Sequence, residues 1–256
     1  MPINYNNLRL FGMFGLKLFK FSEDADGNYL IDVSANIIPW LIVAFLLVGI
    51  AAYLLGTFNF AIIISKHKYH EDIREFGSGN AGMTNMMRTY GRSVGIATFV
   101  LDFLKGAMAV VIGWFLLGEA GGYFAGFCCV LGHAFPVWYG FKGGKGVAVS
   151  TAMVFVLEPL VGVFLLVIFV AIVAFTKYLS LGSIMSMLMY PILLQNVYAA
   201  VHPQRSWLYG LVMLFCLLTS LLVIFLHREN MKRIMDHKEN KFSFKKKGNR
   251  SENSDK

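Results

Sequence analysis

Charge is what this sequence of 256 residues has little of, since Asp, Glu, Lys and Arg make up only 15% of it. Soluble domains carry about 25% charged residues, and disordered chains combine high charge with few apolar residues. Here 57% of the residues are hydrophobic and the mean hydropathy is +0.60. The composition therefore excludes both classes and indicates an integral membrane protein.

Cysteine and proline are also scarce, with three and six copies. Cys128, Cys129 and Cys216 all lie inside apolar runs, where cysteine behaves as a small buried hydrophobe. We therefore expect no disulfide framework and no metal site. The chain shows no internal repeat and no low-complexity linker, which favours a single membrane domain.

Seven apolar runs predict an all-α fold of seven transmembrane helices. A helix needs about 20 residues to cross the hydrocarbon core, and the third and fourth runs are short for a full span. We expect these two helices to tilt little, to thin the bilayer or to lie beside a polar cavity. The runs cover residues 37–64, 94–118, 121–136, 146–158, 160–176, 179–200 and 207–226.

The membrane domain is predicted at residues 37–241, between two terminal segments. Residues 1–36 form an N-terminal extension, and a cleaved signal peptide is rejected because the first apolar run is too long for one. The stretch LRLFGMFGLKLFKF in this extension fits an amphipathic helix on the bilayer or an irregular loop equally well. Residues 242–256 form a basic tail that we expect to rest on anionic lipid.

Lysine and arginine concentrate in alternate loops, and this predicts the orientation in the membrane. The loop at 65–93 holds five, the loop at 137–145 holds two and the tail from Arg228 holds ten. The loops near residues 119, 158 and 202 hold only Arg205 between them. Because basic loops remain in the cytoplasm, the glycine-rich segments and the C-terminus are placed there, with the N-terminus outside.

A polar, glycine-rich segment, FGSGNAGMTNMMRTYG at residues 76–91, lies between two apolar runs. Its glycines permit positive φ and a close approach of backbone N–H groups to a ligand. Such a loop, followed by a helix that begins at Thr84 or Asn85, favours phosphate binding over a plain connection. Arg88 adds a planar fork of donors one turn later. The expected ligands are Gly77, Ser78, Gly79, Asn80, Gly82, Thr84, Asn85 and Arg88.

A second glycine-rich segment, GHAFPVWYGFKGGKGVAVSTA at residues 132–152, repeats the pattern. It is not a nucleoside-triphosphate P-loop, because the GxxxxGK[ST] spacing is missing: the lysine of GKG is followed by Gly146 and then Val147, with no Ser or Thr. Its two lysines are either ordinary membrane anchors or phosphate ligands, and two cationic glycine loops on one membrane face favour ligands. The expected ligands here are Lys142, Gly143, Gly144, Lys145 and Gly146.

Two charges lie inside an apolar run, at Asp102 and Lys105 of LDFLKG. Because they are three residues apart on one helix face, we predict an ion pair with a structural role. His133 and His227 end apolar runs, where a histidine is more often a cap or a packing contact than a catalyst. His227 is the stronger candidate, since Asn230 follows it by one turn.

Two phosphate dianions about 7 Å apart repel by roughly 9 kcal/mol at an effective dielectric of about 20, so a site for both needs several cations. The candidates are Arg88, Lys142, Lys145 and, if it is protonated, His227. In KYLSLGSI, the hydroxyl groups of Ser180 and Ser183 fit either helix packing or ligand contact.

Five segments in order resemble the bacterial membrane acyltransferases that use acyl phosphate to acylate glycerol 3-phosphate. They are DIREFGSGNAGMTNMMR, DFLKG, GHAFPVWYGFKGGKGVA, YLSLGSI and HRENMKRIMDHKENK, and the resemblance runs from about Ile50 to Lys241. It implies seven helices in the bacterial cell membrane, with the site facing the cytoplasm. It also implies acyl transfer to the sn-1 hydroxyl, giving 1-acyl-glycerol 3-phosphate and phosphate for phospholipid biosynthesis.

The resemblance implies that the partners are these two substrates and membrane lipid, with no cofactor, no metal and no nucleic acid. Contact with other enzymes of phospholipid synthesis is left open. The first glycine-rich segment is implicated in catalysis and phosphate binding, and the second in glycerol phosphate binding. HRENMKRIMDHKENK, here called the third motif, is implicated in activity and the integrity of the site. Either His227 or a substrate phosphate could accept the hydroxyl proton. The residues implied to be catalytic are Ser78, Arg88, His227 and Asn230, and those with a structural role are Asp102, Lys105 and Glu239.

Three other readings compete with this one. A transporter of a phosphorylated metabolite would also use cationic sites and broken helices, but the hydropathy shows no inverted repeat. A scaffold protein would leave the clustered glycines and basic residues without a role. His67 and Asp72 match the H-x-x-x-x-D pattern of acyltransferases that use acyl-CoA, but the companion FPEGTRS-type motif is absent. We interpret that match as accidental.

Overall fold

The computed structural model describes residues 20–23, 29–32, 37–201 and 207–242, so most of the two predicted terminal segments lies outside the described residues. In the extension, strand β1 (Lys20–Glu23) pairs antiparallel with β2 (Tyr29–Asp32), and Phe21 lies opposite Ile31. This hairpin adds a small sheet that the all-α prediction did not include, whereas the LRLFGMFGLKLFKF stretch at residues 8–21 lies almost wholly outside the described residues. The strands contain aromatic and β-branched residues, which favour extended pairing.

The seven predicted apolar runs all form helix, and the described residues contain four segments long and apolar enough to cross a membrane: Pro39–Tyr69, Arg92–Tyr139, Pro159–Thr176 and Tyr209–Leu226. The helices are α2 (Ile37–Thr57), α3 (Phe60–Tyr69), α4 (Met83–Tyr90), α5 (Arg92–Ala134), α6 (Val147–Leu157), α7 (Pro159–Thr176), α8 (Leu179–Val201), α9 (Trp207–Leu226) and α10 (Arg228–Met235). Two 3-10 turns, η2 (Ile73–Glu75) and η3 (Val137–Tyr139), lie in the loops.

The first predicted helix is in fact broken between α2 and α3. Asn59 caps α3 by accepting a hydrogen bond from the Ile62 N–H, and its Nδ2 donates to the Ala81 carbonyl. The break leaves the carbonyls of Gly56 and Phe58 without helical partners, and Lys105 Nζ donates to both. The break therefore ties the membrane helices to the first glycine-rich loop.

The second and third predicted helices are the two halves of α5. They meet at Gly118, whose φ of 72° and ψ of −164° lie outside the helical region. The halves pack closely through small residues, since a Cβ on Gly113 would meet Ala125 and the backbone of Gly121. Such contacts let helix backbones approach within a membrane.

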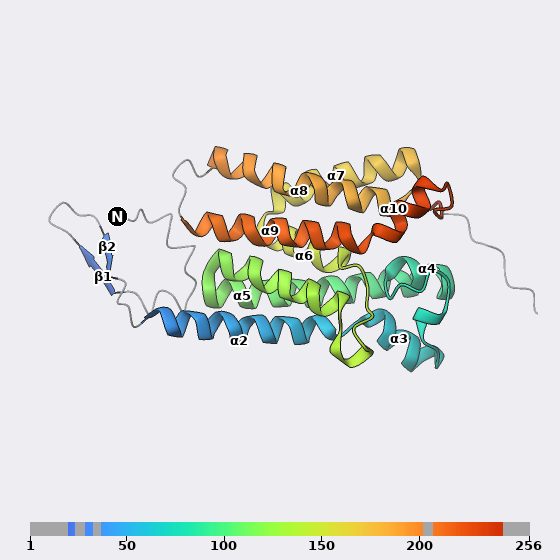
Figure 1. Ribbon diagram of the computed structural model, residues 1–256, viewed down its shortest axis with the longest axis horizontal. Coiled ribbons are helices and arrows are strands. Elements are labelled where there is room, and N and C mark those ends of the chain that lie inside the picture. The colour runs from blue at the N-terminus through green and yellow to red at the C-terminus, as the bar shows by residue number, and fades with distance from the viewer. Residues whose placement is uncertain (1–19, 24–28, 33–36, 202–206, 243–256) are drawn as a thin grey trace, which may run out of the picture.

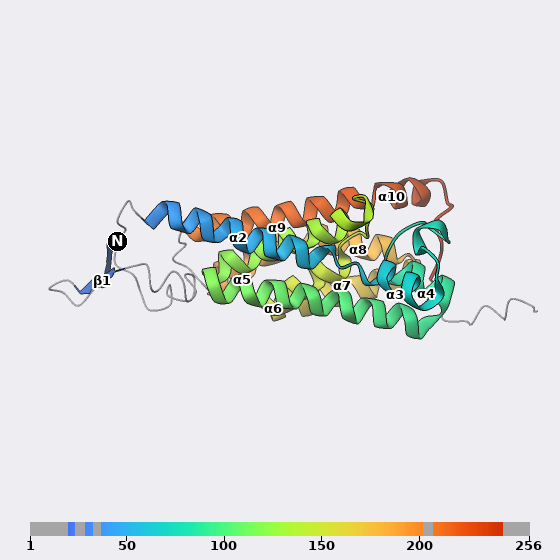
Figure 2. The same ribbon diagram turned by 90° about the horizontal axis from the view of Figure 1, so that it is seen from below.

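Figures 1 and 2 show the helices running along one long axis, with α3, α4 and α10 gathered at one end. The N-terminal hairpin lies at the other end. Large apolar side chains point outward from the bundle, among them Leu47, Val167 and Leu221, each more than half exposed. This outward apolar surface is what a helix bundle presents to lipid.

Candidate functional site

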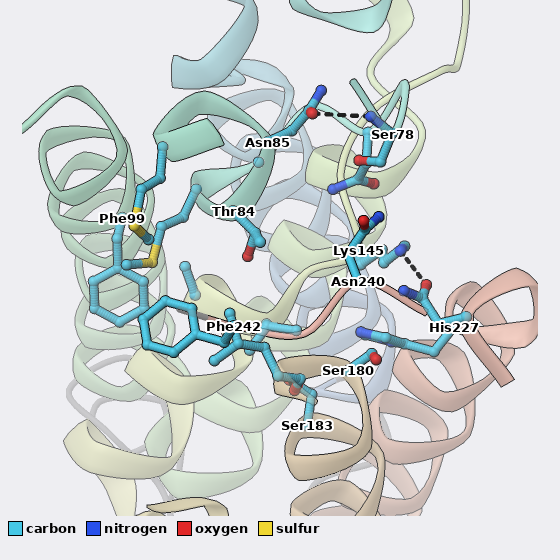
Figure 3. Close-up of a pocket in the computed structure, with 18 of the residues that line it drawn as sticks. Ser78, Thr84, Asn85, Phe99, Lys145, Ser180, Ser183, His227, Asn240 and Phe242 are labelled. Carbon is cyan, nitrogen blue, oxygen red and sulfur yellow. Dashed lines mark hydrogen bonds between the residues drawn. The ribbon is translucent and has the colours of Figure 1, made fainter. Parts of the chain in front are cut away.

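A cavity of about 330 Å³ lies at the end of the bundle that carries α4 and α10, and both helices line it (Figure 3). Helices α4 to α8 and α10, with the segments next to them, contribute to its wall. Its lining includes Ser78, Asn80, Gly82, Thr84, Asn85, Arg88, Asp102, His133, Lys145, Gly146, Ser180, Ser183, His227, Asn230, Arg233 and Glu239. The two glycine-rich segments and the third motif therefore converge on one space.

The first glycine-rich loop is held in shape by the buried side chain of Asn85. Its Oδ1 accepts from the Ser78 N–H at 3.0 Å, and its Nδ2 donates to the carbonyls of Ile73 and Phe76 at 3.1 and 2.9 Å. Gly77 has φ +59°, and a Cβ there would overlap Asn85 Oδ1. The amide of Asn85 is thus committed to the loop, although the sequence suggested it as a helix start or a ligand contact.

Helix α4 begins at Met83, with Gly82 in the cap position, rather than at Thr84 or Asn85 as predicted. The N–H groups of its first turn lack acceptors within the helix and carry the positive end of the helix dipole. Thr84 and Arg88 lie on α4 and line the cavity, as do Ser78 and Asn80 of the preceding loop. Gly77 and Gly79 shape that loop with positive φ, outside the lining.

The second glycine-rich loop differs from its prediction. The N–H groups of Gly143 and Gly144 donate to the carbonyls of Ala134 and His133 at 3.0 and 3.1 Å, so both are already used. A Cβ on Gly144 would overlap the imidazole of His133. These two glycines therefore dock the loop against the end of α5.

The two lysines of this loop separate in space. Lys142 is exposed and outside the cavity lining, and its carbonyl accepts a hydrogen bond from Arg74 at 3.1 Å. Lys145 lines the cavity just before Gly146, which has φ +78° and precedes α6. The pKa of Lys145 is lowered to about 8, mainly by burial and in part by the charge of Arg233. Of the two lysines in this loop, only Lys145 therefore lines the cavity.

Lys145 is linked to the third motif through a chain of hydrogen bonds. Its Nζ donates to Asn230 Oδ1, and Asn230 Nδ2 donates to Glu239 Oε1 at 2.8 Å (Figure 3 marks the first). The hydroxyl of Ser180 donates to the same carboxylate oxygen at 2.8 Å, and Arg233 Nε donates to the other at 2.8 Å. Glu239 therefore links α8 to α10 through its two carboxylate oxygens.

Arg233 was missed by the sequence reasoning. It lines the cavity three residues after Asn230 on α10, so it lies on the same helix face. That spacing in HRENMKR is the signal that could have identified it. Arg88, Lys145 and Arg233 are the lysine and arginine residues that line the cavity among the described residues.

His227 is oriented by one hydrogen bond, 2.7 Å between its Nδ1 and the Val223 carbonyl. A carbonyl only accepts, so Nδ1 carries the hydrogen and Nε2 is an acceptor in the neutral ring. Figure 3 shows the ring directed into the cavity. Burial lowers the pKa of His227 to about 4, opposed by the hydrogen bond to Val223 and assisted by the charge of Lys145. His227 is therefore neutral at pH 7, so the condition under which it would count among the cations is not met.

The predicted pair of Asp102 and Lys105 forms in the floor of the site, with Nζ 2.7 Å from the carboxylate. Lys105 Nζ also lies 3.0 Å from His133 Nδ1, which must act as the acceptor. Both side chains of the pair are almost fully buried. Asp102 and His133 line the cavity, whereas Lys105 lies behind them and braces α5.

The other half of the cavity is apolar. Figure 3 shows Phe99 and Phe242 on one side, with Lys145 and His227 on the other. Ser183 also lines the cavity, and its hydroxyl donates to the Leu179 carbonyl at 3.0 Å. The apolar lining consists of Met83, Met87, Phe99, Val147, Ala148, Phe169, Leu179 and Phe242. A cavity divided in this way fits a molecule with a charged head and a hydrocarbon chain.

The H-x-x-x-x-D match lies outside this cavity. His67 is exposed near the end of α3. Asp72 caps η2 and contacts Arg74 at 2.7 Å, and the hydrogen bond from Arg74 is the main reason that its pKa is lowered to about 2. The two side chains therefore have structural or surface positions.

Comparison with known proteins places these features in a family. The model of the family described as glycerol-3-phosphate acyltransferase matches residues 46–237. A glycerol-3-phosphate acyltransferase of Finegoldia magna is 39% identical over 196 residues, covering 77% of this chain and 95% of that protein. One from Clostridioides difficile is 39% identical over 211 residues, covering 80% and 98%.

A solved structure is similar as well. The crystal structure of PlsY, an integral membrane glycerol 3-phosphate acyltransferase, in its glycerol 3-phosphate form superposes with a TM-score of 0.70. The two sequences are 36% identical, and the match covers 78% of this chain and 96% of the other. The lysophosphatidic acid form of PlsY gives a TM-score of 0.67 at 34% identity, over 78% and 95%.

Proposed function

The chain belongs to the glycerol-3-phosphate acyltransferase family, and on that premise we propose that its acyl donor is an acyl phosphate. The products are then 1-acyl-glycerol 3-phosphate and inorganic phosphate. The observation that carries the proposal is that Arg88 and Lys145, from separate glycine-rich segments, line one cavity whose other half is apolar. Such a cavity suits two phosphate groups and one acyl chain.

The charge balance supports two bound phosphates. Two dianions about 7 Å apart repel by roughly 9 kcal/mol at an effective dielectric of about 20. Arg88, Lys145 and Arg233 supply three positive charges, and the first turn of α4 adds N–H donors. We assign the phosphate of the acyl donor to Ser78, Arg88 and the start of α4. The phosphate of glycerol 3-phosphate then lies near Lys145 and Arg233.

The reaction itself needs little help from acid or base groups. The primary hydroxyl oxygen attacks the acyl carbonyl carbon, the bond from that carbon to the phosphate oxygen breaks, and phosphate leaves. The second pKa of a phosphate group, which describes protonation of its dianion, is about 6. The pKa of His227 is lower, at about 4. The phosphate is therefore the better acceptor of the hydroxyl proton. His227 Nε2 accepts a hydrogen bond from the secondary hydroxyl of glycerol 3-phosphate, which orients the substrate so that its primary hydroxyl donates to the phosphate oxygen. Asn230 holds Lys145 in place.

We also propose that seven helices span the bacterial cell membrane with the site facing the cytoplasm. The site end of the bundle carries many basic residues, as cytoplasmic loops do. In the described chain they include Lys66, Lys68, Arg74, Arg92, Lys142 and Lys177. This topology is tested by replacing exposed Lys142 with cysteine. In sealed inside-out vesicles, a membrane-impermeant thiol reagent should label the variant, whereas right-side-out vesicles should leave it unlabelled.

The donor is tested with the purified protein in lipid, given palmitoyl phosphate and labelled glycerol 3-phosphate. A labelled lysolipid is expected, and palmitoyl-CoA in place of palmitoyl phosphate should give none. Ser78→Ala and Arg88→Ala should lose the product, while Arg92→Ala, which changes an exposed arginine at the start of α5, serves as the control. Product from palmitoyl-CoA alone would contradict the proposed donor. Accumulation of glycerol 3-phosphate in sealed vesicles without product would instead favour a transporter.

A further inference from the structure

The residues that follow α10 cross back to the cavity. We name residues 239–242 the C-terminal strap, and three of them, Glu239, Asn240 and Phe242, line the cavity. The family match ends at residue 237, so the strap lies beyond it. The family match therefore says nothing about how these three residues shape the cavity, whereas the structure does.

The strap is attached at two points. At its start, Glu239 accepts hydrogen bonds from Ser180, Asn230 and Arg233. At its end, the backbone N–H of Phe242 donates to the carbonyl of Lys177 at 2.7 Å, in the turn between α7 and α8. The residues between these points are exposed. The strap therefore bridges α10 and the α7–α8 turn without belonging to either.

Phe242 lies at the apolar end of the cavity, and Figure 3 shows its ring beside that of Phe99. Phe99 belongs to α5, and Phe169 reaches the same cavity from α7. Phe169 is held against α8, because a Cβ on Gly182 would come within 2.9 Å of its ring. Two of these three rings are therefore carried by packed helices, and Phe242 alone among the three is carried by an irregular segment.

This end of the cavity borders the lipid-facing surface. Ile96 and Val100, neighbours of Phe99 on α5, are 53% and 45% exposed, and Val170, next to Phe169, is 54% exposed. A long hydrocarbon chain whose head lies among Arg88 and Lys145 would leave the cavity here. The ring of Phe242 stands at that exit.

We infer that Phe242 is a specificity-determining residue for the acyl group, because its ring limits how an acyl chain passes from the cavity to the bilayer. This inference rests on the proposed function. A short chain fits within the cavity and leaves the ring in place. A long chain must displace the ring, so the residue at position 242 sets the preference between them.

The test compares palmitoyl phosphate with octanoyl phosphate as donors for the purified protein in lipid. Phe242→Ala should raise the palmitoyl-to-octanoyl ratio of kcat/KM by about tenfold, within the range of hydrophobic pocket discrimination, and Phe242→Trp should lower it. Phe242→Pro removes the N–H that holds the strap to Lys177 and should also raise the ratio. Two controls should keep the wild-type ratio: Phe175→Ala, at a lipid-facing ring 89% exposed, and a chain ending at Phe242.

An unchanged ratio in both Phe242→Ala and Phe242→Trp, or a lower ratio in Phe242→Ala, would overturn the inference. A variant that is only less stable loses activity with both donors equally, and so leaves the ratio unchanged. The wild-type assay separates this result from the proposed function. If only acyl-CoA gives product, the donor proposal fails, and the same ratio is measured with octanoyl-CoA and palmitoyl-CoA.

Discussion

Lys145 Nζ donates a hydrogen bond to Oδ1 of Asn230, and this contact joins the second glycine-rich loop to α10. The same amide donates through Nδ2 to Glu239. Because the direct partner of Lys145 is a neutral amide, the contact positions the ammonium group without cancelling its charge. The charge therefore remains available to a phosphate.

Asn230→Ala should lower the rate roughly 100-fold, the effect of misplacing a group by about 1 Å. The substitution leaves Lys145 without its acceptor and removes one donor from Glu239. The rate of lysolipid formation is measured beside the thermal unfolding temperature. Asn196→Ala is the matched control, since that amide bonds within its own helix, to the Ile192 carbonyl at 2.7 Å. A rate equal to that of the control would contradict the role of Asn230.

The pH profile should depend on Lys145. Its pKa is lowered to about 8, so it loses its charge as the pH rises through 8, and kcat/KM for glycerol 3-phosphate should fall there. In Lys145→Arg the charge persists to higher pH, and the alkaline fall should move upward. The phosphate groups titrate near pH 6, so the alkaline limb is the informative one. An alkaline limb identical in both proteins would assign it to another group.

The two histidines of interest should respond differently. His67→Ala should leave turnover within about twofold, because His67 is exposed and outside the cavity. His227→Ala should lower it about 100-fold, within the range for a positioned proton-transfer or hydrogen-bonding group. His227→Asn restores a hydrogen-bonding group and should recover part of the rate if His227 orients the hydroxyl. If His67→Ala lowered turnover as much as His227→Ala, the hypothesis of an H-x-x-x-x-D catalytic motif would be supported instead.

The buried pair of Asp102 and Lys105 should contribute strongly to the free energy of unfolding. Lys105→Met leaves the carboxylate of Asp102 buried without a counter-charge, which costs about 3–5 kcal/mol in the free energy of unfolding. The double variant Lys105→Met with Asp102→Leu should recover part of that loss. Recovery should be incomplete because Lys105 also donates to the carbonyls of Gly56 and Phe58. The measurement is thermal unfolding of Lys105→Met, Asp102→Leu and the double variant in detergent, and strict additivity of the two single effects would contradict the coupling.

Sequence reasoning brought the right motifs together but misjudged how individual residues serve them. Asn85, Gly143 and Gly144 were assigned to ligand binding, yet their polar groups are satisfied by the protein backbone. Local spacing cannot show which donors a fold has already used, because their acceptors come from distant segments. The carbonyl acceptors for Gly143 and Gly144, for example, lie at the end of α5.

The protonation state of His227 was also beyond the sequence. Its pKa of about 4 follows from burial and from the nearby Lys145. Both conditions arise only when α9 and the second glycine-rich loop pack together. The place of Phe242 in the cavity was also beyond the sequence. The residues around it do not show that the C-terminal strap turns back to the Lys177 carbonyl.

By itself, the sequence determined the helical membrane character, the positions of the apolar helices and the pairing of Asp102 with Lys105. These depend on hydrophobicity, on charge and on spacing along one chain segment, which are local properties. Only the tertiary structure decided which polar groups face the cavity, which cations gather there and which ring closes its apolar end. Those outcomes depend on contacts between segments far apart in the chain, and burial at those contacts fixes both the partners and the charge of each group.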